Sequence, residues 1–334
     1  MAPVGYEAQV IDRATPRTRP GRIHPDRLDW VPRPASGATW ERWRTLAAIA
    51  ADDLATARLV EGHLDARAII AELEPHRPLD DDRLGVWAAE APRGGLRATP
   101  DGDGWVLDGN RRWCSGAHEV TTALVTAHAP DGLRLFLLPC DDPGVAPVPG
   151  TWPAVGMAAS DSLEIRLDGV RVGPDAAIGG PGDYLDRPGF WHGAMGVAAC
   201  WFGGAIGVGR LLRAQTCDST DPHRLAHLGA VDAVLSTMAD RLRTAAAEID
   251  ADPHDERDRA ERLARRVRAT VEAGCDEVLT RTGRATGATP LSLDPDHARR
   301  VADLTVYLRQ SHAEADLARL GALTAEATTD WLCR

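Results

Sequence analysis

The sequence predicts an α+β fold in three consecutive parts: N-terminal helices, a central β-barrel domain and a C-terminal helical bundle. Thr39 to Ala71 has helical periodicity with its charges on one side. From Leu84 to Val172 the pattern changes to short runs typical of strands, and from Gly189 onward long helical patterns return. With 334 residues the chain is long enough to bury a large core and to hold two or three domains.

We expect four segments along the chain. They are an N-terminal arm at 1–34, a shortened N-terminal helical domain at 35–83, a central β-domain at 84–180 and a C-terminal helical bundle at 188–334. The arm is rich in proline and arginine and has no apolar core of the kind found in a signal peptide. Tertiary contacts of this arm are therefore expected to be few.

Composition excludes several classes of protein. The net charge of -11 argues against a nucleic-acid partner and against binding to an anionic membrane. Six cysteines occur without a Cys-x-x-Cys pair, so we expect no zinc or other metal site. A reduced, cytoplasmic protein is the simplest interpretation of these cysteines. Lysine is absent and Asn110 is the only asparagine, which we interpret as codon bias in a GC-rich genome.

The N-terminal helical pattern predicts two helices that end before Pro75 and Pro78. It contains a polar cluster, Glu61-Gly62-His63-x-Asp65. We interpret the cluster as the solvated face of a helix, with a site role as the alternative. If no other carboxylate acts as the catalytic base, Glu61 is a candidate for that role.

The β-domain is predicted from five runs with strand character. They lie at 84–90, 104–116, 121–128, 133–139 and 163–172. Asp108-Gly109 and Asp131-Gly132 are typical hairpin turns.

The bundle is predicted from four helical patterns, at 190–213, 223–250, 256–283 and 295–327, the last starting at Asp294-Pro295. Pro188 to Val208 is apolar enough to raise the question of a membrane span. Its apolar character comes from Gly and Ala, and it includes His192. We therefore expect a tightly packed core helix whose glycines admit a neighbouring backbone, and no membrane span.

Four short motifs in the β-domain occur in a fixed order. They are Trp113-Cys114-Ser115-Gly116-Ala117, Gly156-Met157, Ser160-Asp161-Ser162 and Asp168-Gly169-Val170. Together they resemble the central β-domain of the acyl-CoA dehydrogenase family of flavoproteins. The resemblance implies FAD at the junction of barrel and bundle. It also implies a homodimer or homotetramer, because that family builds its cofactor site from two subunits.

The resemblance places cofactor-binding residues in the β-domain. The Trp113 indole would stack near the isoalloxazine ring and Ser115 would form a hydrogen bond to it. Trp87-Ala-Ala-Glu90 resembles the strand whose backbone binds the pyrimidine edge. Arg93, beside Gly94-Gly95, would meet the pyrophosphate; the alternative is an exposed arginine in a turn.

The adenosine half of FAD has weaker support in the sequence. The family's Arg-x-x-Phe-Gly motif is not legible, and the stretch Arg281 to Gly287, which includes Arg284, only loosely resembles the Gln-x-x-Gly-Gly motif. On that loose likeness, Arg284 is a candidate for binding the adenosine half of FAD.

Catalysis in this family removes an α-proton from an acyl thioester with a carboxylate base, while the β-hydride passes to the flavin. Many members carry that base as Glu-Gly before the last helix, whereas this chain has Gln310 and Ser311 in the matching region. A second branch uses reduced flavin and oxygen and typically has a histidine near the end of the chain. His312 and Glu314 are therefore the catalytic candidates, with a solvated helix face as the alternative.

Between these two candidates, helical spacing favours His312 as the inward side chain. Leu308 and Ala315 share its face, whereas Glu314 points to the opposite side. Our first functional hypothesis is an acyl-CoA dehydrogenase-like, FAD-dependent oxidoreductase acting on an acyl thioester or a related small molecule. A two-component flavin-dependent monooxygenase and a non-catalytic assembly partner on the same fold are the alternatives.

Overall fold

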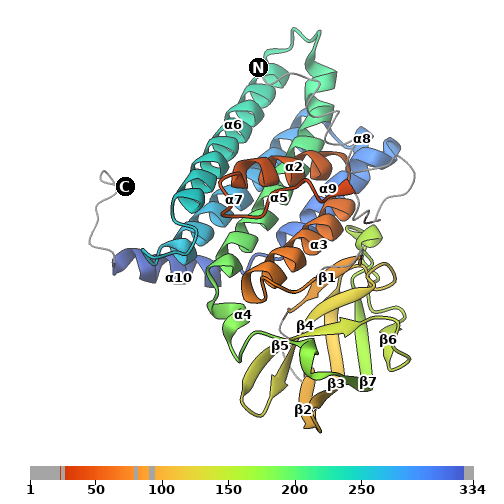
Figure 1. Ribbon diagram of the computed structural model, residues 1–334. Helices are drawn as coiled ribbons and strands as arrows, with labels where there is room; N and C mark the ends of the chain where they lie inside the picture. Colours follow the sequence, from red (N-terminus) through yellow and green to blue (C-terminus); the bar gives the residue numbers. More distant parts are fainter. Residues whose placement is uncertain (1–22, 24–26, 79–81, 90–94, 327–334) are drawn as a thin grey trace.

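The computed structural model describes residues 23, 27–78, 82–89 and 95–326. Helices form the larger part of the molecule and a β-domain lies at one end (Figure 1). The elements follow the predicted order, with two helices before the strands and the long helices after them.

The described helices begin and end at the following residues. They are α2 (Thr39–Asp52), α3 (Leu54–Leu73), α4 (Asp183–Asp186), α5 (Pro188–Thr216), α6 (Pro222–Ala251), α7 (Ala260–Thr286), α8 (Thr289–Leu293), α9 (Pro295–Leu308) and α10 (Glu314–Ala325). The start at Asp294-Pro295 is confirmed, because the Asp294 side chain accepts a hydrogen bond from His297 N at 3.0 Å. Asp53 caps α3 in the same way by accepting from Thr56 N at 2.7 Å.

The single last helix expected at 295–327 is wrong. The chain leaves α9 at Leu308 through a tight turn, in which Gln310 N and Ser311 N donate to the carbonyls three residues earlier. Ala313 then has φ = 44°, which redirects the chain before α10. Residues 309–313 contain no glycine or proline, so the sequence pattern predicted one continuous helix across the break.

One sheet of eight strands forms the β-domain, in the order β6-β7-β3-β2-β4-β5-β8, with β1 paired to β4. The strands are β1 (Leu84–Trp87), β2 (Arg97–Asp101), β3 (Gly104–Cys114), β4 (Thr122–Ala129), β5 (Gly132–Pro139), β6 (Val145–Val148), β7 (Leu163–Val172) and β8 (Ala177–Ile178). The five predicted runs each contain a strand, whereas β2, β6 and β8 were not predicted. Within the described residues β6 and β8 do not pair with each other, so this strand order does not close a barrel.

Asp108-Gly109 is not the hairpin turn that the sequence predicted. Both residues lie inside β3, where Gly109 has φ = 120° and the register with β7 shifts. The pair therefore makes a bulge, and the β2–β3 hairpin turns at Gly102-Asp103 instead. Asp131-Gly132 does lie at the turn between β4 and β5, as expected.

Helix α5 is the core of the helical part, because it packs against α2, α3, α6, α7 and α9. It is long and apolar enough to cross a membrane by composition alone, yet 78% of its most apolar window is buried inside the protein. Glycine allows this packing: a Cβ on Gly203 would lie 2.2 Å from the Ala47 carbonyl oxygen of α2. The expected core helix is confirmed.

The β-domain meets the helices at the loop that carries Gly156 and Met157. Met157 N donates to the Asp303 carboxylate of α9 at 2.5 Å. Arg299, one turn earlier on α9, pairs with Asp303 at 3.5 Å and with Asp53 of α3 at 2.7 Å. One charged network therefore links the β-domain loop to both helices.

We predict that Gly156→Ala destabilises the protein by about 1–3 kcal/mol, because overpacking forces the backbone apart. The added Cβ would lie 2.1 Å from the Ala302 carbonyl oxygen of α9. Denaturant unfolding measures the effect. The matched control is Gly229→Ala in α6, where a Cβ meets nothing within 4 Å and alanine should be neutral or stabilise by up to about 1 kcal/mol. Equal stability of Gly156→Ala and the parent would contradict the close approach.

Candidate functional site

The loop from Trp113 to Ala117 presents an aromatic ring at the end of β3. Trp113 has φ = 59°, and its side chain is 47% exposed. The Arg112 guanidinium lies 5.5 Å from the centre of its ring. A large indole is thus held at the surface of a domain whose other large side chains are mostly buried.

Hydrogen bonds hold this loop to the motif that follows it in the resemblance. Ser115 Oγ lies 2.9 Å from Ser162 Oγ, which lies 2.8 Å from Ser160 Oγ. Gly116 N donates to the Ser160 carbonyl at 2.8 Å. The fold therefore brings Ser115 and the Ser160–Ser162 segment together.

Trp87 contacts the Trp113–Ala117 loop from the core of the protein. Its indole is 2% exposed, and its Nε1 donates to the Ser115 carbonyl at 3.0 Å. The Trp87 side chain is therefore part of the core, and a cofactor contact from its backbone stays a prediction.

The remaining cofactor candidates are placed differently. Glu90 and Arg93 lie outside the described residues. Arg284 is exposed on the last turn of α7. Its proposed contact with the adenosine half of FAD stays a prediction.

The inward orientation of His312 is wrong. His312 lies in the turn between α9 and α10, its side chain is 81% exposed, and its Nδ1 is 3.8 Å from Asp316 Oδ1. Glu314 is also exposed, at the first residue of α10. The argument from helical spacing failed because these residues do not share one continuous helix.

The Glu61–Asp65 cluster does not form a solvated face. The Glu61 side chain is 5% exposed, and Arg58 Nη1 donates to its Oε2 at 2.5 Å. Burial raises the pKa of Glu61 from its ordinary value of 4.5 to about 7, although Arg58 and Arg42 act in the opposite direction. A buried carboxyl that titrates near neutrality is suited to proton transfer.

Other polar side chains surround this pair in the interior. They come from five further helices: Arg42 of α2, Tyr184 of α4, Cys200 of α5, Arg268 of α7 and Tyr307 of α9. Tyr307 is fully buried, and its hydroxyl is a hydrogen-bonding neighbour of the Cys200 thiol. Burial raises the pKa of Tyr307 well above its usual range, so it stays protonated.

No clear signal for this burial is present in the sequence. Helix α3 carries Arg58, Glu61, Asp65 and Glu72 along one side, which is the pattern of a helix with one solvated face. The neighbouring elements nevertheless bury Glu61, so only the tertiary structure reveals it.

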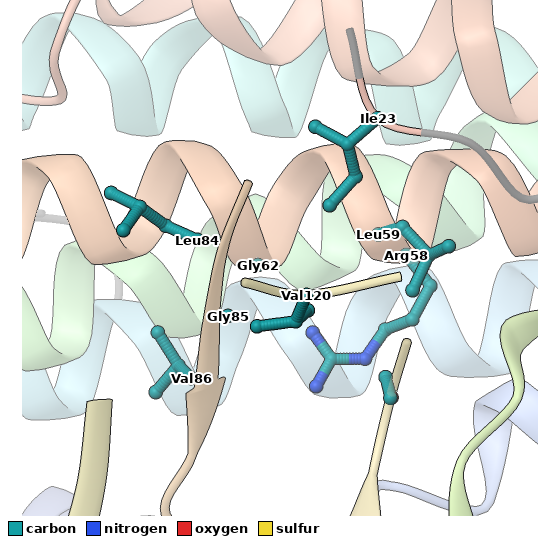
Figure 2. Close-up of a pocket in the computed structure, with 9 residues that line it drawn as sticks. Ile23, Arg58, Leu59, Gly62, Leu84, Gly85, Val86 and Val120 are labelled. Carbon is teal, nitrogen blue, oxygen red and sulfur yellow. The ribbon is translucent and has the colours of Figure 1, made fainter. Parts of the chain in front are cut away.

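A small cavity lies between α3 and the β-domain (Figure 2). Its polar lining consists of Arg58 and Ser115, and the rest is apolar side chains and the glycines Gly62 and Gly85. Arg58 and Ser115 therefore both reach this cavity, which has room for about one water molecule.

Comparison with known proteins supports the resemblance. No protein-family model matches the chain. Over 113 residues the chain is 28% identical to the short-chain specific acyl-CoA dehydrogenase of Bos taurus, covering 30% of this chain and 27% of that protein. Over 97 residues it is 32% identical to the dibenzothiophene monooxygenase of Rhodococcus erythropolis, covering 27% and 23%. These matches span about a quarter of each curated relative.

Solved structures match over most of the chain. FMN-bound TdsC from Paenibacillus sp. A11-2, whose crystal structures are described as those of a dibenzothiophene monooxygenase, has a TM-score of 0.76 at 21% identity, covering 86% of this chain and 83% of that one. FkbI, described as for biosynthesis of a methoxymalonyl extender unit, has a TM-score of 0.78 at 16% identity, covering 96% and 99%. The chain has an acyl-CoA dehydrogenase-like fold.

The described residues of this acyl-CoA dehydrogenase-like chain fit a flavin at the Trp113 loop. The exposed indole offers a flat apolar surface, and two residues further along the chain the Ser115 hydroxyl forms a hydrogen bond with that of Ser162. Among the same residues no group of three His, Cys, Asp or Glu side chains is arranged to hold a metal ion.

The raised pKa of Glu61 predicts a pH dependence of stability. Because the folded state binds this proton up to about pH 7 and the unfolded state only up to about 4.5, stability should fall as pH rises between these values. The fall is on the order of 3 kcal/mol. Glu61→Gln should remove it, as measured by denaturant unfolding across this range.

The control for this experiment is Glu41→Gln, which changes an exposed glutamate paired with Arg44 on α2. It should keep the parent's pH dependence. A Glu61→Gln variant with the same slope as the parent would refute the assignment of the slope to Glu61.

Proposed function

We propose that this chain is a flavin-dependent oxidoreductase whose flavin ring lies on the loop from Trp113 to Ala117. The observation that carries this proposal is the exposed Trp113 indole, fixed in a left-handed backbone conformation beside the Ser115–Ser162 pair. Aromatic surfaces of this size stabilise flat ring systems by stacking. A bound flavin would supply hydride acceptance or, when reduced, the activation of oxygen.

Within this class we favour a two-component monooxygenase. Dehydrogenation of an acyl thioester needs a positioned carboxylate, and the turn between α9 and α10 carries Gln310, Ser311 and His312 instead. Support also comes from the similarity in fold to FMN-bound TdsC and from the partial match to a dibenzothiophene monooxygenase.

Acyl-CoA dehydrogenation is the second candidate, and one observation favours it. Glu61 is a buried carboxyl whose pKa is about 7, and its partner Arg58 reaches the cavity that Ser115 also lines. A base on α3 would replace the one missing from the later turn. The partial matches to short-chain acyl-CoA dehydrogenases support the same candidate.

Flavin type, assembly and location are part of the proposal. Because the sequence lacks clear motifs for the adenosine half, FMN is a candidate cofactor beside FAD. A homodimer or homotetramer in the cytoplasm is the expected state. Absorbance spectra of the purified protein before and after addition of FMN or FAD test the proposal directly. A protein that stays colourless with both would favour the non-catalytic assembly partner.

We predict that Trp113→Ala weakens flavin binding more than it weakens folding. Loss of a stacking ring costs on the order of 1 kcal/mol beyond the lost contact area. The indole is 47% exposed, so its removal should change the free energy of unfolding little. Flavin titration and thermal denaturation measure the two effects. Trp30→Ala, which removes another partly exposed indole, should leave flavin binding unchanged. Equal flavin retention in parent and Trp113→Ala would disprove the stacking role.

We also predict no substantial reduction of an electron-accepting dye with straight-chain acyl-CoAs. Absence of a general base typically lowers the rate by ~10²–10⁴-fold. Anaerobic assays with the flavin-loaded protein measure this rate. Robust turnover that Glu61→Gln abolishes would reverse the order of the two candidates and make Glu61 the base.

A further inference from the structure

Arg111 is a buried cation in the interior of the β-domain. It lies on β3, it is 3% exposed, and its guanidinium donates to the Ala89 carbonyl at 2.6 Å. It also donates to the Thr126 carbonyl and, at 3.0 Å, to Thr126 Oγ1. A buried guanidinium is costly to desolvate, and well-packed apolar side chains are often as stable in place of buried charges. The specific hydrogen bonds of Arg111 are therefore what distinguishes it from a packing residue.

These hydrogen bonds lie where β4 changes its partner strand. On the edge opposite β5, β4 pairs with β1 as far as Val125 and with β2 at His128. Thr126 lies between these two pairings, and its carbonyl accepts from the Arg111 guanidinium there. The same guanidinium binds the Ala89 carbonyl, so it joins β4 to the segment that follows β1.

Arg111 also lies at the base of the Trp113 loop. It pairs in register with Ile165 of β7, and the register between β3 and β7 then shifts before Cys114. Trp113 lies within this irregularity and has φ = 59°. The hydrogen bond from Arg111 to Ala89 therefore joins the start of the Trp113 loop to the end of β1.

A second contact joins the same two segments. Trp87 Nε1 donates to the Ser115 carbonyl at 3.0 Å, so the end of β1 is attached to the Trp113 loop as well as to β3. Trp87 is buried, whereas Ala89 is exposed. The backbone that follows Trp87 therefore leaves the core close to the Trp113 loop, and two hydrogen bonds fix its position.

We propose that Arg111 is a positioning residue for the flavin. By binding the Ala89 carbonyl, it keeps the backbone at Ala88 and Ala89 at a fixed distance from the Trp113 loop, so that this backbone and the indole form two walls of one site. Backbone polar groups at such a wall fix the orientation of a flat ring. The inference rests on the proposed function, because Trp113 is the surface on which the flavin ring is proposed to lie.

The expected defect without Arg111 is local. The Ala89 and Thr126 carbonyls lose their charged donor, whereas the hydrogen bond from Trp87 to Ser115 remains. The segment after β1 should then move more freely beside an unchanged Trp113 loop. A binding site loses affinity when the groups that support it are loosened.

The experiment is titration of the full-length protein with FMN and with FAD, followed by absorbance and fluorescence. Arg111→Met should weaken flavin affinity about tenfold, and the visible absorption band of the flavin that does bind should shift toward that of free flavin. Arg111→Lys keeps the charge and loses the planar fork, so it should restore part of the affinity. Titration at a temperature at which each variant is fully folded separates affinity from stability.

Two control variants separate positioning from a general loss of stability. Arg134→Met removes another arginine of the β-domain, which pairs with Asp131, and it should bind flavin as the parent does. Thr126→Val removes a hydroxyl partner of Arg111 and leaves the hydrogen bond to Ala89 in place. It should lower the unfolding temperature and leave flavin affinity within about twofold of the parent.

Hydrogen exchange of the flavin-free protein tests the effect of Arg111 on the backbone directly. Arg111→Met should speed amide exchange in the peptide that contains residues 84–89. Unchanged exchange there overturns the proposal, and so does an equal loss of flavin affinity in Thr126→Val. If Arg111→Met does not fold, Arg111→Lys decides, and parent-like affinity and exchange in that variant overturn the proposal.

Flavin uptake by the parent distinguishes the two levels of the argument. A parent that binds neither flavin overturns the proposed function, and the flavin role of Arg111 with it. A parent that binds flavin, together with an Arg111→Met variant of equal affinity, overturns the role of Arg111 alone.

Discussion

The Asp303 carboxylate is the interaction on which the arrangement of the site depends. It accepts the Met157 backbone N–H, and through Arg299 it is linked to Asp53 at the start of α3. Burial raises the pKa of Asp303, whereas the Met157 N–H and Arg299 favour its charged form. Removal of Arg299 would leave the buried Asp303 and Asp53 carboxylates without the cation that they share, which costs more than an exposed ion pair contributes.

This network also fixes the candidate flavin site, although Trp113 touches none of its members. Met157 begins the short turn that contains Ser160, and the Ser160 carbonyl holds Gly116 N. Gly116 in turn packs against Leu59 of α3. Helix α9 therefore fixes the loop at Met157, and that loop fixes the Trp113 loop. The contact between Gly116 and Leu59 also attaches the Trp113 loop to α3. A loop that is attached to two helices in this way can hold an exposed aromatic ring in one orientation.

Much of the fold could be predicted from the sequence because its elements have strong periodicity. The five main strands, the buried α5 and the start of α9 at Asp294-Pro295 followed from local pattern alone. The contact of Ser115 with Ser160 and Ser162 was not predicted, since no local rule brings residues so far apart in sequence together.

The wrong or missing predictions concern features that the local sequence pattern does not determine. The break before α10 rests on the backbone of Ala313, a residue that ordinarily favours helix, so His312 was assigned to a helix face that does not exist. The sequence Asp108-Gly109 is compatible with a β-bulge and with a hairpin turn. Only the pairing of this strand with β7 makes it a bulge. Strand β2 was missed because its sequence, Arg97 to Asp101, is polar and mostly exposed.

The burial of Glu61 follows from the architecture as a whole. Only α2 and α3 precede the first described strand, so α3 packs against α2, α5, α9 and β1. These neighbours cover the part of the helix that carries Arg58 and Glu61, so both charges must find partners inside the protein. Arg58 and Glu61 satisfy each other incompletely, at the boundary between the helices and the β-domain. Sequences usually avoid such placements outside functional sites, so the Arg58–Glu61 pair is the feature of the helical part that a purely structural role explains least well.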